Sequence, residues 1–225
     1  YINAVLWLQR NAKPKISHKK NVSICTGARK EIGYNNVFDY SLGNPSVPPP
    51  KAFNDAIIRL LKSPTAVNIH QYSPNLGITE VREAIAQSLN RRFGMHYKTE
   101  HIFMTAGATG AIAHALRAVT KPGDEVITFA PCFPEYKPYV NLSGGILKIV
   151  EPDITNFQIN FESFEKLLTP NVHAILINSP NNPTGIIYNE TTILKLAKIL
   201  EEKQTEFNHD IFIISDEPYR EITFK

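Results

Sequence analysis

From about residue 46 onward, the chain alternates strand-like and helical segments, and this alternation constrains its fold more than any other feature. Residues 172–178 are nearly all apolar, which is typical of a strand buried on both faces of a sheet. Residues 193–200 instead repeat their apolar side chains at helical spacing. Strands that alternate with helices predict a mostly parallel sheet with helices on both faces. The expected fold class is therefore α/β.

The same patterns predict the individual elements. Strands are expected at 101–105, 125–129, 146–150, 172–178 and 211–215, the last of them buried, and helices around 53–61, 79–93, 112–119, 161–168 and 193–200. Thr79 is expected to cap the second of these helices, which ends at Gly94. The helix is expected to turn Val81, Ile85 and Leu89 inward.

The N-terminal part of the chain shows a different pattern. Residues 1–45 are assigned to an N-terminal arm and part of a small domain. Within them, residues 5–8 indicate a short helix, residues 11–36 are polar and irregular, and residues 37–42 are strand-like. Residues 46–225 are assigned to one large domain, which we expect to be incomplete in this chain.

Charge and composition argue against several classes of function. The chain has 24 basic and 21 acidic residues, a balance that gives no reason to expect nucleic acid or a membrane surface as a partner. No apolar run approaches the roughly 18 residues of a membrane helix. Cys25 and Cys132 form neither a disulfide framework nor a zinc pattern, and the seven histidines share no spacing. We therefore expect a cytoplasmic protein without a metal site.

Three short segments directly follow expected strands, where ligands of parallel sheets bind. Residues 178–185, Asn-Ser-Pro-Asn-Asn-Pro-Thr-Gly, form a turn whose amides would donate into a cleft, although a plain surface turn has the same composition. Asp216 places a carboxylate at a strand end, where it either meets a cationic partner or caps the next helix. Residues 105–111 are small and open a helix, which suits a phosphate but equally a tight connection. They match neither a dinucleotide fingerprint nor a P-loop.

Together and in this order, the three segments resemble those of the fold-type I pyridoxal-phosphate enzymes, and within them the class I and II, aspartate-aminotransferase-like group. Four further stretches resemble the same family: 39–45, 72–86, 122–126 and 131–136. The resemblance implies the large cofactor-binding domain of that fold and the cofactor pyridoxal 5′-phosphate. It also implies transfer of an amino group between an amino acid and a 2-oxo acid, by a homodimer with shared active sites.

The resemblance implies roles for individual residues around the cofactor's ring. Asp216 would pair with the ring nitrogen and keep it protonated, so that the ring draws electrons from the reacting carbon. Asn182 and Tyr219 would bind the ring's phenolic oxygen, which makes Asp216 and Tyr219 the catalytic candidates. Phe133 would stack on the ring, whereas composition alone would interpret it as a core residue.

Other residues are implied at the phosphate and the substrate. Gly107, Ala108 and Thr109 would bind the phosphate at the start of a helix. Tyr72 would reach the phosphate bound by the neighbouring subunit, unless it is an ordinary half-buried tyrosine. Gly43 would border the substrate.

The family's catalytic lysine, which holds the cofactor covalently, lies some tens of residues beyond the Asp-x-x-Tyr segment. This sequence ends at Lys225, six residues after Tyr219 and in strand-like surroundings. We therefore expect the lysine to lie outside residues 1–225, and this chain alone to be inactive.

Other functions fit the same residues. Beta-lyases, decarboxylases and synthases of this fold share the cofactor residues, so their reactions stay open. A non-catalytic effector domain of a transcription regulator would be favoured by a basic DNA-binding segment upstream of Tyr1. A degenerate fragment is disfavoured because it has no need to keep Asp216, Asn182 and Tyr219 together.

Overall fold

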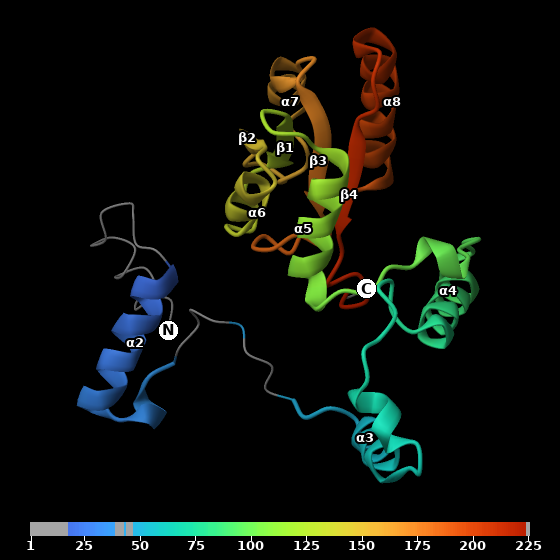
Figure 1. Cartoon of the computed structure of the whole chain (residues 1–225). Coiled ribbons are helices and arrows are strands. Elements are labelled where there is room, and N and C mark those ends of the chain that lie inside the picture. The colour runs from blue at the N-terminus through green and yellow to red at the C-terminus, as the bar shows by residue number, and fades with distance from the viewer. Residues whose placement is uncertain (1–17, 39–42, 44–46, 224–225) are drawn as a thin grey trace. The chain divides into compact units, whose positions relative to one another are not determined.

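The computed structural model describes residues 18–38, 43 and 47–223, without the side chains of residues 18–22. The chain divides into two compact units, Tyr1–Tyr72 and Ser73–Lys225. Figure 1 shows the elements of both units. Among the described residues, no helix combines the length and the apolar character that crossing a bilayer requires.

The first unit contains only helical elements within its described part. They are α2 (His18–Ile32), η1 (Tyr34–Asn36), α3 (Lys51–Lys62) and η2 (Ala66–His70). α3 confirms the predicted helix, but α2 shows that the expectation of irregular structure was wrong for residues 18–32. That expectation relied on apolar periodicity, and α2 forms although its only large apolar residues are Val22, Ile24 and Ile32, which make no regular apolar stripe. The helix expected at residues 5–8 lies outside the described residues, and Val37 and Phe38 form no strand.

The second unit alternates helices with parallel strands. Its elements are α4 (Thr79–Phe93), η3 (Thr99–His101), α5 (Gly107–Val119), β1 (Glu125–Phe129), α6 (Tyr136–Leu142), β2 (Ile146–Val150), α7 (Phe161–Leu167), β3 (Val172–Asn178), α8 (Glu190–Phe207) and β4 (Phe212–Asp216). Asn160 and Asn189 cap α7 and α8, since each side-chain oxygen accepts a backbone N–H three residues later. The predicted α/β class is confirmed, and β1, β2 and β3 have the predicted bounds.

The described sheet has the order β2-β1-β3-β4, and all three pairings are parallel. β4 occupies one edge and pairs with β3 alone within this sheet. Phe212 and Ile213 are 43% and 47% exposed, so the expectation that this strand is buried was wrong. The apolar sequence predicted burial, but an edge strand is covered less completely than one with neighbours on both sides.

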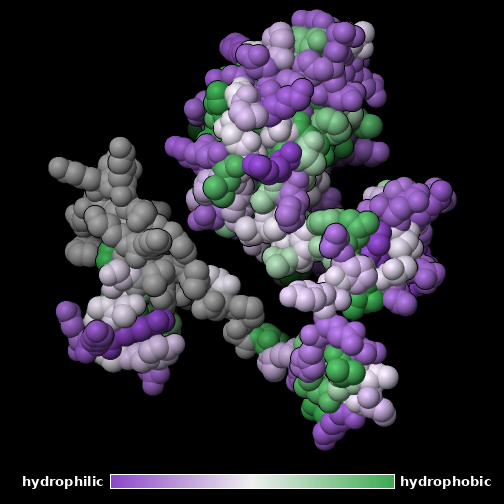
Figure 2. Space-filling model, viewed as in Figure 1, coloured by the Kyte–Doolittle hydropathy of each residue, from purple (hydrophilic) through white to green (hydrophobic). Residues whose placement is uncertain are grey.

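Two apolar clusters fill the space on opposite faces of the sheet. Val126 and Leu176 point toward α5 and α6, together with Leu116 and Val140. The alternate strand positions, such as Ile127 and Ile175, point toward α7 and α8. This two-residue alternation places helices on both faces, as predicted. Figure 2 shows mostly hydrophilic residues over the outer surface where α7 and α8 lie.

The segment before α5 differs from its prediction. Residues 102–105 form no strand, and the short helix η3 directly precedes them. The backbone N–H of Met104 donates to the carbonyl of Leu76 at 3.2 Å, so this stretch bonds to a loop. A strand-like composition forms a strand only where a neighbouring strand supplies partners.

α4 also differs from its prediction in the residues it buries. Val81 is 42% exposed, whereas Arg82 is buried. The Arg82 guanidinium donates to the carbonyls of Ile102 (2.8 Å) and Thr99 (2.7 Å), which explains how a charged side chain is buried there. Ile78 rather than Thr79 occupies the N-cap position, and the helix ends at Gly94 as predicted.

The chain connections create a crevice at one end of the sheet. α6 connects β1 to β2 on one face, and α8 connects β3 to β4 on the other. The connections therefore leave the adjacent strands β1 and β3 toward opposite faces. In open α/β sheets, ligands bind at such a switch point, at the carboxyl ends of the strands.

Candidate functional site

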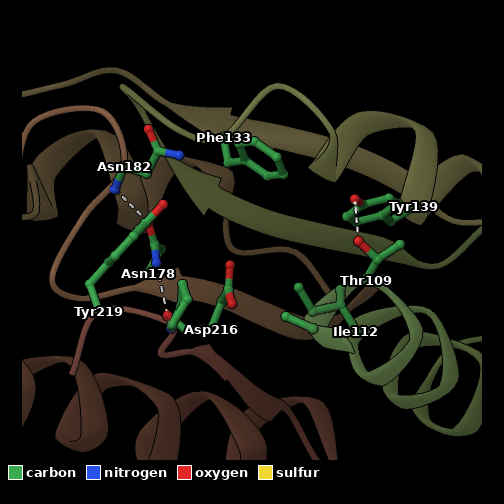
Figure 3. A pocket seen from close by; sticks show the side chains of 10 residues that line it. Thr109, Ile112, Phe133, Tyr139, Asn178, Asn182, Asp216 and Tyr219 are labelled. Carbon is green, nitrogen blue, oxygen red and sulfur yellow. Dashed lines mark hydrogen bonds between the residues drawn. The ribbon is translucent and has the colours of Figure 1, made fainter. Parts of the chain in front are cut away.

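A pocket of about 210 Å³ lies at this switch point, beside the N-terminus of α5. Its lining residues come from α5, from α6 and from the segments that follow β1, β3 and β4: Ala108, Thr109, Ile112, Phe133, Tyr139, Asn178, Asn182, Asp216, Pro218 and Tyr219. Figure 3 shows their side chains around one common space. The three segments singled out in the sequence thus meet in one cleft.

Asp216 is the last residue of β4, and its carboxylate is held by a tyrosine of α6. The phenol of Tyr136, which is 1% exposed, donates to Asp216 Oδ2 at 2.6 Å. Burial of Tyr136, and then this hydrogen bond to the Asp216 carboxylate, raise the pKa of the phenol well above its usual range. Tyr136 therefore stays a proton donor at any physiological pH and fixes the orientation of the carboxylate.

Asn178, which is 4% exposed, joins the ends of β3 and β4. Its Nδ2 donates to the backbone carbonyl of Asp216 at 2.8 Å, and its Oδ1 accepts from the backbone N–H of Asn182 at 2.6 Å. The Asn178 amide thus fixes the position of the Asp216 backbone and the start of the turn at the same time. Asn178 opens the segment 178–185, whose amides were expected to donate into a cleft, but its bond to the neighbouring strand β4 was not predicted.

Asn181 fixes the rest of the turn. Its Oδ1 accepts from the backbone N–H and the hydroxyl of Thr184, at 3.1 and 2.8 Å. Its Nδ2 donates to the carbonyl of Pro131 at 3.3 Å, which ties the turn to the segment after β1. With Asn181 engaged in the turn, the Asn182 side chain lines the pocket (Figure 3).

Phe133 contributes an aromatic wall. Its ring makes an edge-to-face contact with the Tyr136 ring, with 5.7 Å between the centroids, and also packs against the cluster under α5 and α6. The core interpretation and the pocket interpretation of Phe133 therefore both describe its position. The neighbouring Cys132 has its pKa raised by burial, which keeps this thiol a poor nucleophile.

The N-terminus of α5 lines another part of the pocket, where Thr109 lies beside Tyr139 and away from Asn182 and Tyr219 (Figure 3). Gly107 has a φ of +78°, and a Cβ there would meet nothing within 4 Å, so the backbone is open to a close ligand. The first N–H groups of a helix have no carbonyl of their own helix behind them and attract anions. Thr109 adds a hydroxyl, whose Oγ1 lies 3.0 Å from the Tyr139 Oη.

The structure brings together most, but not all, of the predicted residues. Ala108, Thr109, Phe133, Asn182, Asp216 and Tyr219 line the pocket, and Gly107 precedes them on α5. Gly43 and Tyr72 belong to the first unit and are exposed, so the pocket is described without them. The pocket is also lined by residues that were not predicted individually: Ile112, Tyr139, Asn178 and Pro218.

The site suits one kind of ligand chemically. The Asp216 carboxylate favours a protonated ring nitrogen, and the helix N-terminus with the Thr109 hydroxyl favours an anion. Between them, Phe133 and Ile112 provide apolar surface for a flat ring, and the Asn182 amide and the Tyr219 phenol provide hydrogen bonds. The residues therefore fit a phosphorylated pyridine.

Comparison with known proteins gives consistent matches. Residues 35–225 match the sequence model of the family described as aminotransferase class I and II. An aspartate aminotransferase of Thermotoga maritima is 33% identical over 190 residues, which are 84% of this chain and 48% of that protein. A probable aspartate/prephenate aminotransferase of Thermus aquaticus is 32% identical over 217 residues, 96% of this chain and 53% of its own length.

Solved structures agree with the sequence comparison. A crystal structure of an aminotransferase from Eubacterium rectale superposes with a TM-score of 0.89 at 38% identity, covering 99% of this chain and 56% of that one. An aspartate aminotransferase of Thermus thermophilus with maleate has a TM-score of 0.76 at 27% identity, covering 96% and 53%. The chain spans about half the length of the curated relatives that it matches.

Proposed function

The chain belongs to the family of class I and II aminotransferases, and from this membership we propose that the whole protein transfers an amino group between an amino acid and a 2-oxo acid. Members of this family use pyridoxal 5′-phosphate. The observation that carries the proposal is the pocket in which Asp216, Asn182 and Tyr219 meet the N-terminus of α5. The relatives whose names specify transfer of amino groups favour this reaction over the lyase, decarboxylase and synthase alternatives.

We assign the ring of the cofactor to the space between Phe133 and β4. Asp216 would hold the protonated ring nitrogen, and Phe133 would cover one face of the ring. Asn182 and Tyr219 would donate to the phenolic oxygen, and both line the pocket beside Asp216. When bound, the cofactor supplies an electron-withdrawing ring that stabilises the negative charge left on a substrate carbon by loss of its proton.

The phosphate is assigned to the first turn of α5. Ala108 and Thr109 would bind it through backbone N–H groups and the Thr109 hydroxyl. Gly107, whose own N–H donates to the Thr105 carbonyl at 3.0 Å, would let the phosphate approach the backbone closely. The protein's own contribution is preorganisation: Tyr136 and Asn178 fix Asp216 before any ligand arrives. Charge at the ring nitrogen is then met by a carboxylate that does not need to reorient.

The remaining assignments concern the whole protein. We propose a homodimer in which Tyr72 reaches the phosphate of the neighbouring subunit, and Tyr72 is fully exposed within this chain. Gly43 would border the substrate, residues 1–45 would belong to an arm and a small domain, and residues 46–225 to the large domain. A cytoplasmic location completes the proposal. The expectation that residues 1–225 alone would be inactive stays a prediction.

The proposal is tested on the complete protein in two steps. Titration with pyridoxal 5′-phosphate should change the visible absorbance, and amino acids offered with 2-oxo acids should exchange their amino groups. The Asp216→Ala variant should lose transfer on the order of a hundredfold or more, because it removes the fixed charge. Asp210→Ala removes an exposed carboxylate outside the pocket and should leave transfer unchanged. A wild-type protein that binds no cofactor would overturn the proposal.

A further inference from the structure

The phosphate end of the pocket contains a second hydroxyl that the family resemblance did not indicate. Tyr139 lies on α6, thirty residues after Thr109, and its Oη is 3.0 Å from Thr109 Oγ1. Both side chains line the pocket, and Figure 3 shows them in contact with each other. The Tyr139 ring also packs against the apolar cluster under α5 and α6, and this packing holds its hydroxyl group in place.

The two hydroxyls form a chain with a preferred direction. Either oxygen could donate, but a phenol is the more acidic group and therefore the better donor of the two. When Tyr139 donates to Thr109 Oγ1, the proton of Thr109 is directed to a different acceptor. Thr109 is the third residue of α5, beside the open N–H groups of its first turn, so an anion bound there is the natural acceptor.

We propose that Tyr139 is a positioning residue for anion binding: it donates to Thr109 Oγ1 and thereby directs the Thr109 hydroxyl at the phosphate of the cofactor. The inference rests on the proposed function, because it assumes a phosphate at the first turn of α5. Consecutive hydroxyls polarise one another, so the Thr109 proton is a stronger donor with Tyr139 behind it than alone. Tyr139 thus acts on affinity for the phosphate through Thr109.

The test compares two ligands that differ by the phosphate alone, pyridoxamine 5′-phosphate and pyridoxamine. Their dissociation constants are measured by fluorescence titration of the complete protein, and their ratio gives the preference for phosphate. Tyr139→Phe keeps the packed ring and removes the donor. It should reduce the preference about three- to tenfold, as expected for one hydrogen bond, and should leave pyridoxamine binding unchanged.

A double-mutant cycle separates positioning from a simple loss of packing. Thr109→Ala should reduce the preference for phosphate at least as much. Adding Tyr139→Phe to it should reduce the preference no further, because Tyr139 then has no Thr109 hydroxyl to act through. Thr109→Ser keeps the hydroxyl and should preserve the effect of Tyr139→Phe. Tyr97→Phe, which removes a phenol outside the pocket, serves as the control.

The outcomes are distinct. Equal weakening of both ligands by Tyr139→Phe would indicate a structural role and overturn the proposal, as would independent effects of the two substitutions. An unchanged preference for phosphate would also overturn it. If the wild-type protein bound neither ligand, the proposed function itself would fail.

Discussion

Tyr136 Oη lies 2.6 Å from Asp216 Oδ2, although the two residues are 80 positions apart in the sequence. The bond joins α6, on one face of the sheet, to the end of the edge strand β4. β4 pairs with only one strand of the described sheet, and the Tyr136 bond is a further contact at the end of this strand. The carboxylate that the proposed function depends on is therefore held by a hydrogen bond from α6 as well as by its own strand.

Removing this phenol should lower the stability of the protein. In Tyr136→Phe the ring still fills its buried position, but Asp216 loses a donor, which costs about 1–2 kcal/mol of unfolding free energy. Urea denaturation of the variant and the wild type measures the difference. Tyr97→Phe, at an exposed tyrosine, should change it by less than about 0.5 kcal/mol. Equal stabilities of the Tyr136 variant and the wild type would contradict the structural role given to the bond.

Buried tyrosines should make the fold sensitive to high pH. Burial, and then the nearby Cys132, raise the pKa of Tyr188 from 10.0 to about 12. Above pH 10 the unfolded chain therefore loses the Tyr188 proton while the folded state keeps it. Stability is intact below pH 10 and should fall through the window up to about pH 12, by at most about 1.4 kcal/mol per pH unit for this residue.

Denaturant unfolding at a series of pH values across that window measures the slope. Tyr188→Phe should make the decline shallower, because its side chain has no proton to lose. The remaining decline should include Tyr136, whose pKa is also raised by burial. A slope that is the same with and without Tyr188 would show that this phenol ionises equally in both states.

Two glycines with positive φ should respond differently to the same substitution. Gly77 has a φ of +99°, and a Cβ there would lie 2.7 Å from the Cβ of Met104, which leads into α5. Gly94 has a φ of +64° at the end of α4 and open space around it. Gly94→Ala should cost about 1 kcal/mol and Gly77→Ala about 2–4 kcal/mol, since only the second adds a clash. Thermal unfolding ranks the two variants, and the opposite ranking would refute the described contact.

Asn178 should matter more for ligand binding than its position inside a strand suggests. Asn178→Ala leaves the carbonyl of Asp216 and the N–H of Asn182 without this partner, at a cost of about 2–3 kcal/mol. We also expect weaker binding of pyridoxamine 5′-phosphate, because both pocket residues lose their fixed positions. Asn171→Ala, at an exposed asparagine before β3, should leave stability and binding unchanged. Loss of stability without loss of ligand binding would show that Asn178 stabilises the fold but does not position the pocket residues.

The sequence predicted the elements that carry a strong local pattern. β1, β2 and β3 and the helices α3, α5, α7 and α8 follow apolar runs or helical stripes, and these patterns do not depend on distant residues. The errors have a non-local cause. Residues 102–105 lack a strand partner, and β4 is exposed because of its place in the sheet. Both facts depend on the order of the strands, which periodicity does not contain.

The site also contains residues that local patterns predicted and residues that they did not. The predicted pocket residues after β1, β3 and β4 came from short segments at strand ends, which a parallel sheet brings together, whereas Ala108 and Thr109 open α5 without a strand before them. Tyr136 and Tyr139 act through partners 80 and 30 residues away, so no local pattern marked them. α6 itself was missed because Pro138 interrupts its pattern. Since α6 begins at Tyr136, Pro138 falls in the first turn, where its missing N–H removes no helical bond.

The proposed function depends on one orientation of the cofactor, with its ring nitrogen at Asp216 and its phosphate at the first turn of α5. A crystal structure of the complete protein with pyridoxamine 5′-phosphate measures this most directly. We expect a ring nitrogen within hydrogen-bonding distance of the Asp216 carboxylate, Phe133 against the ring, and phosphate oxygens at Ala108 and Thr109. A ring bound elsewhere, or one with its phosphate toward Asp216, would contradict the account.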